Sequence, residues 1–228
     1  MSLAAAALAA ALQALYPGLD AKQQTPAFTI SWTQAKPGRR PDTVVVLAGR
    51  ASRADATTSA ELAVLEKQGA SFRVRARRAG WEGLDGPAAL PDRDHDAVVG
   101  LDLAPFELRP GEFAIGVVTE HQNTGNHGAE TTRALELFRE DAGRLVSVLS
   151  VPTKEESESD QVVSATADDM DVRSESQSRS SVIVMLKTLT AGFFDLNVRV
   201  TDASDPAHKN HSTRRYRWAG ARYEPAGS

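Results

Sequence analysis

Histidine is the most chemically versatile residue type in this chain, and its placement is uneven. Four of the five histidines lie in two polar stretches that each follow an apolar run. An imidazole can bind a transition metal or act as a general base near neutral pH. If both stretches emerge at one rim of the fold, their side chains could converge. The candidate binding set is His121, Asn123, His127, Asp202, Asp205, His208 and His211.

Two interpretations of this set stay open. Carboxylates such as Glu120, Asp202 and Asp205 could supply oxygen ligands or orient a base, with the metal unknown. The alternative is that polar loops simply expose their histidines to solvent. The spacing matches no zinc signature, so a metal-assisted hydrolase is the second hypothesis rather than the first.

Two further clusters have an ordinary explanation beside a chemical one. In Asp92-Arg93-Asp94-His95-Asp96 a histidine is flanked by carboxylates, which suits acid/base work. Neighbouring strand residues point to opposite faces, however, so a charged strand entry is the alternative. The acidic run 168–171, with Glu155, Glu156, Glu158 and Asp160 upstream, could hold calcium, but it lacks the EF-hand glycine and suits a solvated loop.

Arginines alternate with apolar residues on two predicted strands. Arg73, Arg75 and Arg77 should point away from Phe72, Val74 and Ala76, and a similar pattern recurs near the C-terminus. Such a face could meet an acidic protein, an anionic glycan or a lipid head group, or it could only protect a sheet edge. The predicted basic face is Arg73, Arg75, Arg77, Arg215 and Arg217.

Composition narrows the function classes. The 228 residues carry a net charge of −4 with a pI near 5.8, which disfavours general nucleic-acid binding. The chain has no cysteine, which excludes disulfides, thiolate metal sites and a cysteine nucleophile. No apolar run is long enough for a transmembrane segment. No G-x-S-x-G, phosphate-cradling glycine loop or H-E-x-x-H occurs, and we expect no cofactor.

The elements that must position these residues follow one plan three times: an apolar strand, a polar loop, a second strand, a tight turn and a third strand. A further strand candidate precedes each copy. We therefore predict a mainly β protein built from three related antiparallel four-strand meanders, propeller-like or multi-sheet, within one domain. The units are 27–77, 97–150 and 181–225. Gly69, Gly143 and Gly220 are expected at hairpin turns that need positive φ.

Two segments lie outside these units. Residues 4–16 predict a short helix, because Leu8, Leu12 and Leu15 share one face and Pro17 follows. The alanine-rich start resembles the end of a secretory signal but lacks its positive n-region. We expect a periplasmic or secreted protein whose signal peptide has been removed, with a cytoplasmic location as the alternative. Residues 153–180 are polar and suggest a mobile insertion, with a weak strand at 161–165.

The C-terminal segment carries a resemblance. Gly-Phe-Phe-Asp-Leu-Asn-Val-Arg-Val at 192–200 is followed by Arg-Arg-Tyr-Arg-Trp-Ala-Gly-Ala-Arg-Tyr at 214–223. This pattern is similar to the closing hairpin of many uncharacterised bacterial secreted or periplasmic β-rich proteins. The match covers about thirty-five of 228 residues and has no assigned activity. It implies an exported β-rich protein of a Gram-negative bacterium and carries over no functional residue.

Three function hypotheses follow from the sequence. The first is a non-enzymatic exported binding module whose long polar loops contact an unknown protein or glycan partner. The second is the metal-assisted hydrolase that uses the loop histidines. The third is an envelope structural protein whose arginine face meets anionic lipid or glycan.

Overall fold

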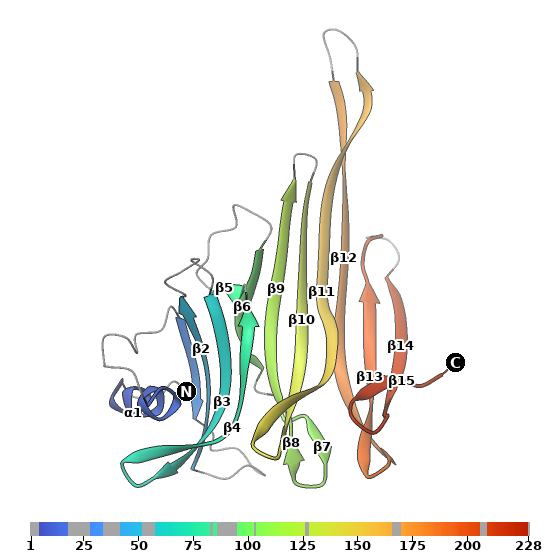
Figure 1. The fold of residues 1–228 in the computed structure, drawn as a ribbon. Coiled ribbons are helices and arrows are strands. Elements are labelled where there is room, and N and C mark those ends of the chain that lie inside the picture. The colour runs from blue at the N-terminus through green and yellow to red at the C-terminus, as the bar shows by residue number, and fades with distance from the viewer. Residues whose placement is uncertain are drawn as a thin grey trace.

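The computed structural model confirms a mainly β protein with one short N-terminal helix (Figure 1). It describes residues 5–17, 28–33, 42–51, 58–82, 84–85, 95–102, 104–125, 128–165, 170–205 and 209–227. No helix in these ranges has the length and apolar character needed to cross a membrane.

Three antiparallel four-strand meanders form the framework, and each consists of strands that pair with their neighbours in order. The first contains β1 (Phe28–Thr33), β2 (Thr43–Ala51), β3 (Thr58–Gln68) and β4 (Ser71–Glu82). The second contains β6 (His95–Asp102), β9 (Ile115–Gly125), β10 (Gly128–Asp141) and β11 (Arg144–Ala165). The third contains β12 (Met170–Thr190), β13 (Phe193–Asp202), β14 (Asn210–Trp218) and β15 (Tyr223–Pro225). The predicted meanders are therefore present.

The meanders join edge to edge into one thirteen-stranded sheet rather than separate propeller blades. β11 is the junction: Arg144 forms a parallel bridge to Arg77 of β4, and the far half of β11 pairs with β12. The short strand β5 (Leu84–Asp85) lies parallel to β6. A separate hairpin of β7 (Glu107–Arg109) and β8 (Glu112–Phe113) completes the described strands.

Residues 153–180, predicted as a mobile insertion with a weak strand at 161–165, consist largely of strand, and the predicted strand lies within β11. β11 and β12 occupy most of this segment and pair from Lys154↔Ser180 to Ala165↔Met170, with one register shift between Val162 and Ser164. In Figure 1 they form an arm that extends beyond the other hairpins. Residues 154–159 and 175–180 of this arm are all polar, so this part of the sequence lacks the apolar alternation that marks a half-buried strand.

The predicted second polar loop is also mostly strand. β9 and β10 continue through it, so that His121 lies opposite Thr132 and Asn123 opposite Glu130. The turn glycines behave as predicted: φ is +63° at Gly69, +80° at Gly143 and +90° at Gly220.

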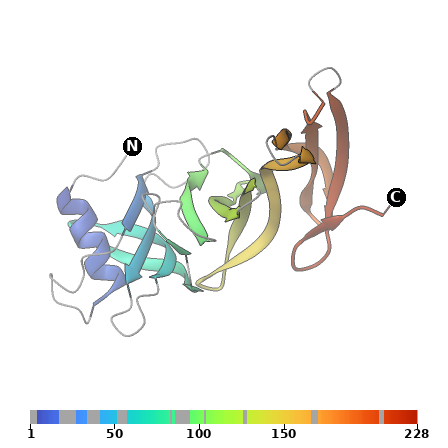
Figure 2. The ribbon, with the colours of Figure 1, turned by 90° about the horizontal axis from the view of Figure 1, so that it is seen from above.

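Helix α1 (Ala5–Leu15) packs as the leucine spacing predicts. Leu12 and Leu15 are buried against Val44, Val46 and Leu65 on the outer face of the first meander. Figure 2 shows the helix on that outer side, with the third meander at the opposite end of the molecule. Burying apolar side chains here is the main force that fixes the helix, because isolated helices of this length are marginal in water.

Residues on the two faces of β10 and β11 belong to two further hydrophobic cores. One core packs Leu47, Leu62 and Val64 of the first meander against Phe138 and Leu145. The other packs the third meander and the β7–β8 hairpin against the reverse face; its members include Leu137, Leu149, Leu196, Trp218 and Tyr223. The second meander thus links the other two through buried apolar contacts.

A β-bulge corrects one detail of the predicted arginine face. The β3–β4 register shifts between Val64↔Ala76 and Leu65↔Val74, which leaves Arg75 as the extra residue. Beyond the bulge the alternation of β4 inverts. Phe72 and Val74 therefore face the helix, whereas Ala76 joins the core on the other side.

Candidate binding site

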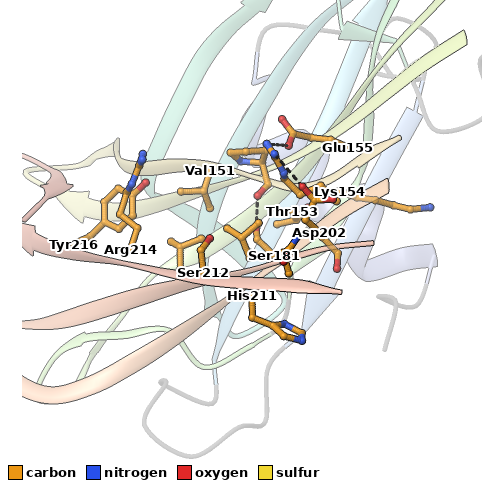
Figure 3. Close-up of a pocket in the computed structure, with 16 residues that line it drawn as sticks. Val151, Thr153, Lys154, Glu155, Ser181, Asp202, His211, Ser212, Arg214 and Tyr216 are labelled. Atoms are coloured by element: carbon orange, nitrogen blue, oxygen red, sulfur yellow. Dashed lines mark hydrogen bonds and ion pairs between the residues drawn. The ribbon is translucent and has the colours of Figure 1, made fainter. Parts of the chain in front are cut away.

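A pocket of about 420 Å³ is lined by residues of the strands β11 to β14 (Figure 3). We call it the trough. It is lined by Val151, Pro152, Thr153, Lys154, Glu155, Arg179, Ser180, Ser181, Val198, Val200, Asp202, Asn210, His211, Ser212, Arg214 and Tyr216.

The trough lies where β11 and β12 stop pairing. Their last registered pair is Lys154↔Ser180, and beyond it the two strands diverge. A shift in the β10–β11 register leaves Thr153 as an extra residue of β11. Its hydroxyl donates to the carbonyl of Arg133 at 3.3 Å, and the hydroxyl of Ser181 donates to the carbonyl of Pro152. These bonds satisfy main-chain oxygens at the point where the ladder opens.

Strand alternation explains the composition of the trough. Val198, Val200 and Asp202 follow each other at every second position of β13 and share one face. Ser212 and Arg214 do the same on β14. Val198 also belongs to the core beneath, so an apolar floor passes directly into a polar border. Such a surface can hold a ligand by contact area and orient it by hydrogen bonds.

The border contains a charged triad that spans three strands. Arg179 lies opposite Glu155 on β11 and Asp202 on β13 in the strand registers. Its guanidinium is 3.5 Å from the Glu155 carboxylate and 3.3 Å from that of Asp202. Residues directly opposite in neighbouring strands share a face, so the three side chains form one row. A smaller hollow of about 220 Å³ continues from the triad toward the arm.

Asp202 is held in its charged form. Hydrogen bonds from Ser204, both from its side chain and from its main-chain N–H at 3.1 Å, and the nearby Arg179 guanidinium lower the pKa of Asp202 below its ordinary value. The carboxylate therefore stays ionised near neutral pH and keeps Arg179 in place.

The structure divides the predicted histidine set. Asp202 and His211 both line the trough, but the His211 ring turns to the other face of the sheet, where Nδ1 is 3.2 Å from the Thr201 hydroxyl. Figure 3 shows this ring pointing away from Ser181 and Val151. Asp205 lies just after β13 and is exposed.

Two other members of that set, His121 and Asn123, do not lie at the trough. His121 and Asn123 lie on β9, and four strands separate β9 from β14 in the order of the sheet. His127 and His208 lie outside the described residues. Within the described ranges, no three histidine or carboxylate side chains are grouped closely enough to hold a metal ion.

Glu120, considered as an oxygen ligand, is engaged by its neighbours. Its carboxylate accepts hydrogen bonds from Arg133 and, at 2.5 Å, from the Gln122 side chain. Burial by itself would raise the pKa of Glu120, but these bonds and the arginine charge outweigh it and lower the pKa below its ordinary value.

Carboxylates engage four arginines of the predicted basic face. Arg73 is 2.7 Å from Glu66, Arg77 is 3.8 Å from Glu61, and Arg215 is 2.6 Å from Asp195. Arg75 binds Glu140 through two nitrogens and donates to the Thr43 hydroxyl at 3.4 Å. The charge of these four arginines is therefore balanced within the sheet.

Sequence reasoning did not single out Arg179, Ser181 or Ser212. Arg179 and its neighbours lie in the polar segment that suggested an insertion, and serine gives little signal alone. The spacing of Val198, Val200 and Asp202 was the one usable clue, because it places a carboxylate beside an apolar floor. Comparisons with protein-family models, with curated proteins and with solved structures each found nothing that matches the chain.

Proposed function

We propose that this protein is a non-enzymatic binding module that holds its ligand in the trough. The observation that carries the proposal is the trough itself, an apolar floor bordered by the Glu155–Arg179–Asp202 triad and by hydroxyl groups. Arg179 pairs with both carboxylates of the triad, and the Ser181 hydroxyl donates to a main-chain carbonyl. This arrangement favours recognition of a ligand over attack on it. We take the partner to be a protein or a glycan.

We propose a periplasmic or secreted location for this module. The support is the resemblance of residues 192–223 to the closing hairpin of exported bacterial proteins. Expressing the protein as a cleavable fusion to a reporter that is active only in the oxidising periplasm, followed by cell fractionation, tests the location directly.

One pair of neighbouring substitutions tests the trough. Ser212 and Thr213 are both exposed on β14, but only the Ser212 side chain lines the trough. Ser212→Trp should fill part of the trough and abolish binding of a ligand selected on glycan and linear-peptide arrays. Thr213→Trp places the same bulk on the other face and should bind within about twofold of the parent, since the change lies outside the contact.

Melting temperatures of both variants without ligand control for folding. Adding the ligand should raise the melting temperature of the parent and of Thr213→Trp, but not that of Ser212→Trp. If the arrays yield no ligand that Ser212→Trp loses, the trough is not the binding surface.

A further inference from the structure

The outer edge of β14 lies beside the trough and is only partly paired. On its inner side β14 pairs with β13 from Leu196↔Tyr216 to Asp202↔Asn210. On its outer side β15 pairs only from Tyr216 to Trp218. Within the described residues, no strand pairs with the outer edge of residues 210–214.

One hydrogen bond fixes which main-chain groups face outward. The N–H of Ala226 donates to the carbonyl of Arg215 at 2.8 Å from the side on which β15 lies. In an antiparallel strand, N–H and C=O of one residue point the same way and alternate from residue to residue. The main-chain groups of His211 and Thr213 therefore point outward as well, and both residues are exposed.

We propose that this edge accepts an extended acidic segment of a partner polypeptide as an added β-strand. Main-chain hydrogen bonds to His211 and Thr213 would hold the segment, and every second side chain would fall on the trough side of the sheet. The inference rests on the proposed function of the trough and names its ligand class.

Charge complementarity selects the occupant. Strand β14 carries Arg214, Arg215 and Arg217 and no carboxylate. Arg215 is engaged by the buried Asp195, and Arg217 lies opposite Glu224 of β15, whereas Arg214 and Lys209, which precedes β14, are exposed beside the unpaired edge. A cationic edge repels the same edge of a second copy and attracts an acidic strand. This combination favours a partner segment rich in Glu or Asp over self-association through β14.

The first experiment uses a fluorescently labelled peptide of alternating Glu and Thr, blocked at both ends. We expect saturable binding by anisotropy that weakens as salt is raised, because the charges lie at the surface. The same peptide with Lys in place of Glu should not bind. The same peptide N-methylated at alternate residues should also fail, since it cannot complete the ladder.

Hydrogen exchange locates the bound peptide. The amides of His211 and Thr213 should exchange more slowly when the acidic peptide is present. Thr213→Pro removes an outward N–H without breaking a bond to β13 and should weaken binding at least about tenfold. Thr213→Ala keeps that N–H and should bind within about twofold of the parent. Arg214→Glu gives a second test that leaves the main chain intact, and binding should fall with it.

The outcomes separate this inference from the proposed function. A peptide that Ser212→Trp loses, but that leaves both amides unprotected and tolerates N-methylation, would keep the trough and overturn the added strand. If glycans bind in the trough and no acidic peptide binds, the trough proposal likewise stands and the added strand is overturned. If no ligand depends on the trough at all, both proposals fail.

Discussion

Asp195 is a buried carboxylate that is paired with an arginine. It is 1% exposed, and its carboxylate accepts hydrogen bonds from Arg215 at 2.6 Å and from Thr188 at 3.0 Å. Nearby in the sequence, Phe193 stacks on Trp218 with 3.9 Å between the ring centroids. The Tyr223 hydroxyl donates to the carbonyl of Phe194 at 2.8 Å. Except for Thr188, these residues lie within 192–223, so the residue pattern of this segment has a structural explanation.

The charge of Asp195 stabilises the fold in a pH-dependent way. Burial would raise its pKa, but hydrogen bonds from Thr190, Arg215 and Thr188 outweigh burial and lower the pKa below the usual 3.8. A carboxyl whose folded pKa is depressed contributes stability above its unfolded pKa. That contribution is lost as pH falls through the folded pKa.

We therefore predict that Asp195→Asn lowers the free energy of unfolding at neutral pH by about 2 kcal/mol, since Arg215 loses its buried partner. The variant should also lose part of the acid dependence of stability below about pH 4. Urea unfolding across pH measures both effects. Glu224→Gln is the matched control, because its pair with Arg222 is solvent-exposed and should contribute well under about 1 kcal/mol. Equal losses in both variants would contradict this account of Asp195.

At the scale of elements, the start of β10 lies very close to the main chain of β11. A Cβ at Gly128 would lie 2.1 Å from the carbonyl oxygen of Glu158 on β11, and φ there is +155°. Gly125, which pairs with Gly128 in the β9–β10 register, has no atom within 4 Å of such a Cβ.

Gly128→Ala should therefore open the end of the β10–β11 ladder, where Gly128 pairs with Ser159. Amide exchange at Glu158 and Ser159 should accelerate, while global stability falls by less than about 1 kcal/mol, because the opening is local. Gly125→Ala should leave exchange unchanged. Unaltered exchange in Gly128→Ala would show that the strands do not approach so closely.

The sequence predicted elements wherever apolar alternation and turn chemistry agreed. Three meanders and their turn glycines were readable for that reason, and helix α1 was readable from the spacing of its leucines. The polar halves of β11 and β12 were not, apart from the weak strand at 161–165, because strands with two polar faces lack that signal. The bulge at Arg75 was also unreadable, since it depends on which residues oppose it across the ladder.

At the scale of the whole molecule, three meanders form one sheet whose parts pack through two separate cores on β10 and β11. The parallel contact of β4 with β11 and the divergence of β11 from β12 are long-range events. Local sequence patterns carry no information on them, so the histidines could be found in the sequence but the trough could not. The predicted convergence of histidines on one rim assumed a symmetry that a continuous sheet does not impose.

The trough is the central claim, and mapping a bound ligand by NMR tests it most directly. An isotope-labelled sample is titrated with the best ligand from the glycan and peptide arrays, and amide shifts are followed. We predict that the largest changes fall at Val151, Ser181, Val200 and Ser212, all of which line the trough. Changes confined to helix α1 and strands β2 to β4, or to the far ends of β9 and β10, would contradict it.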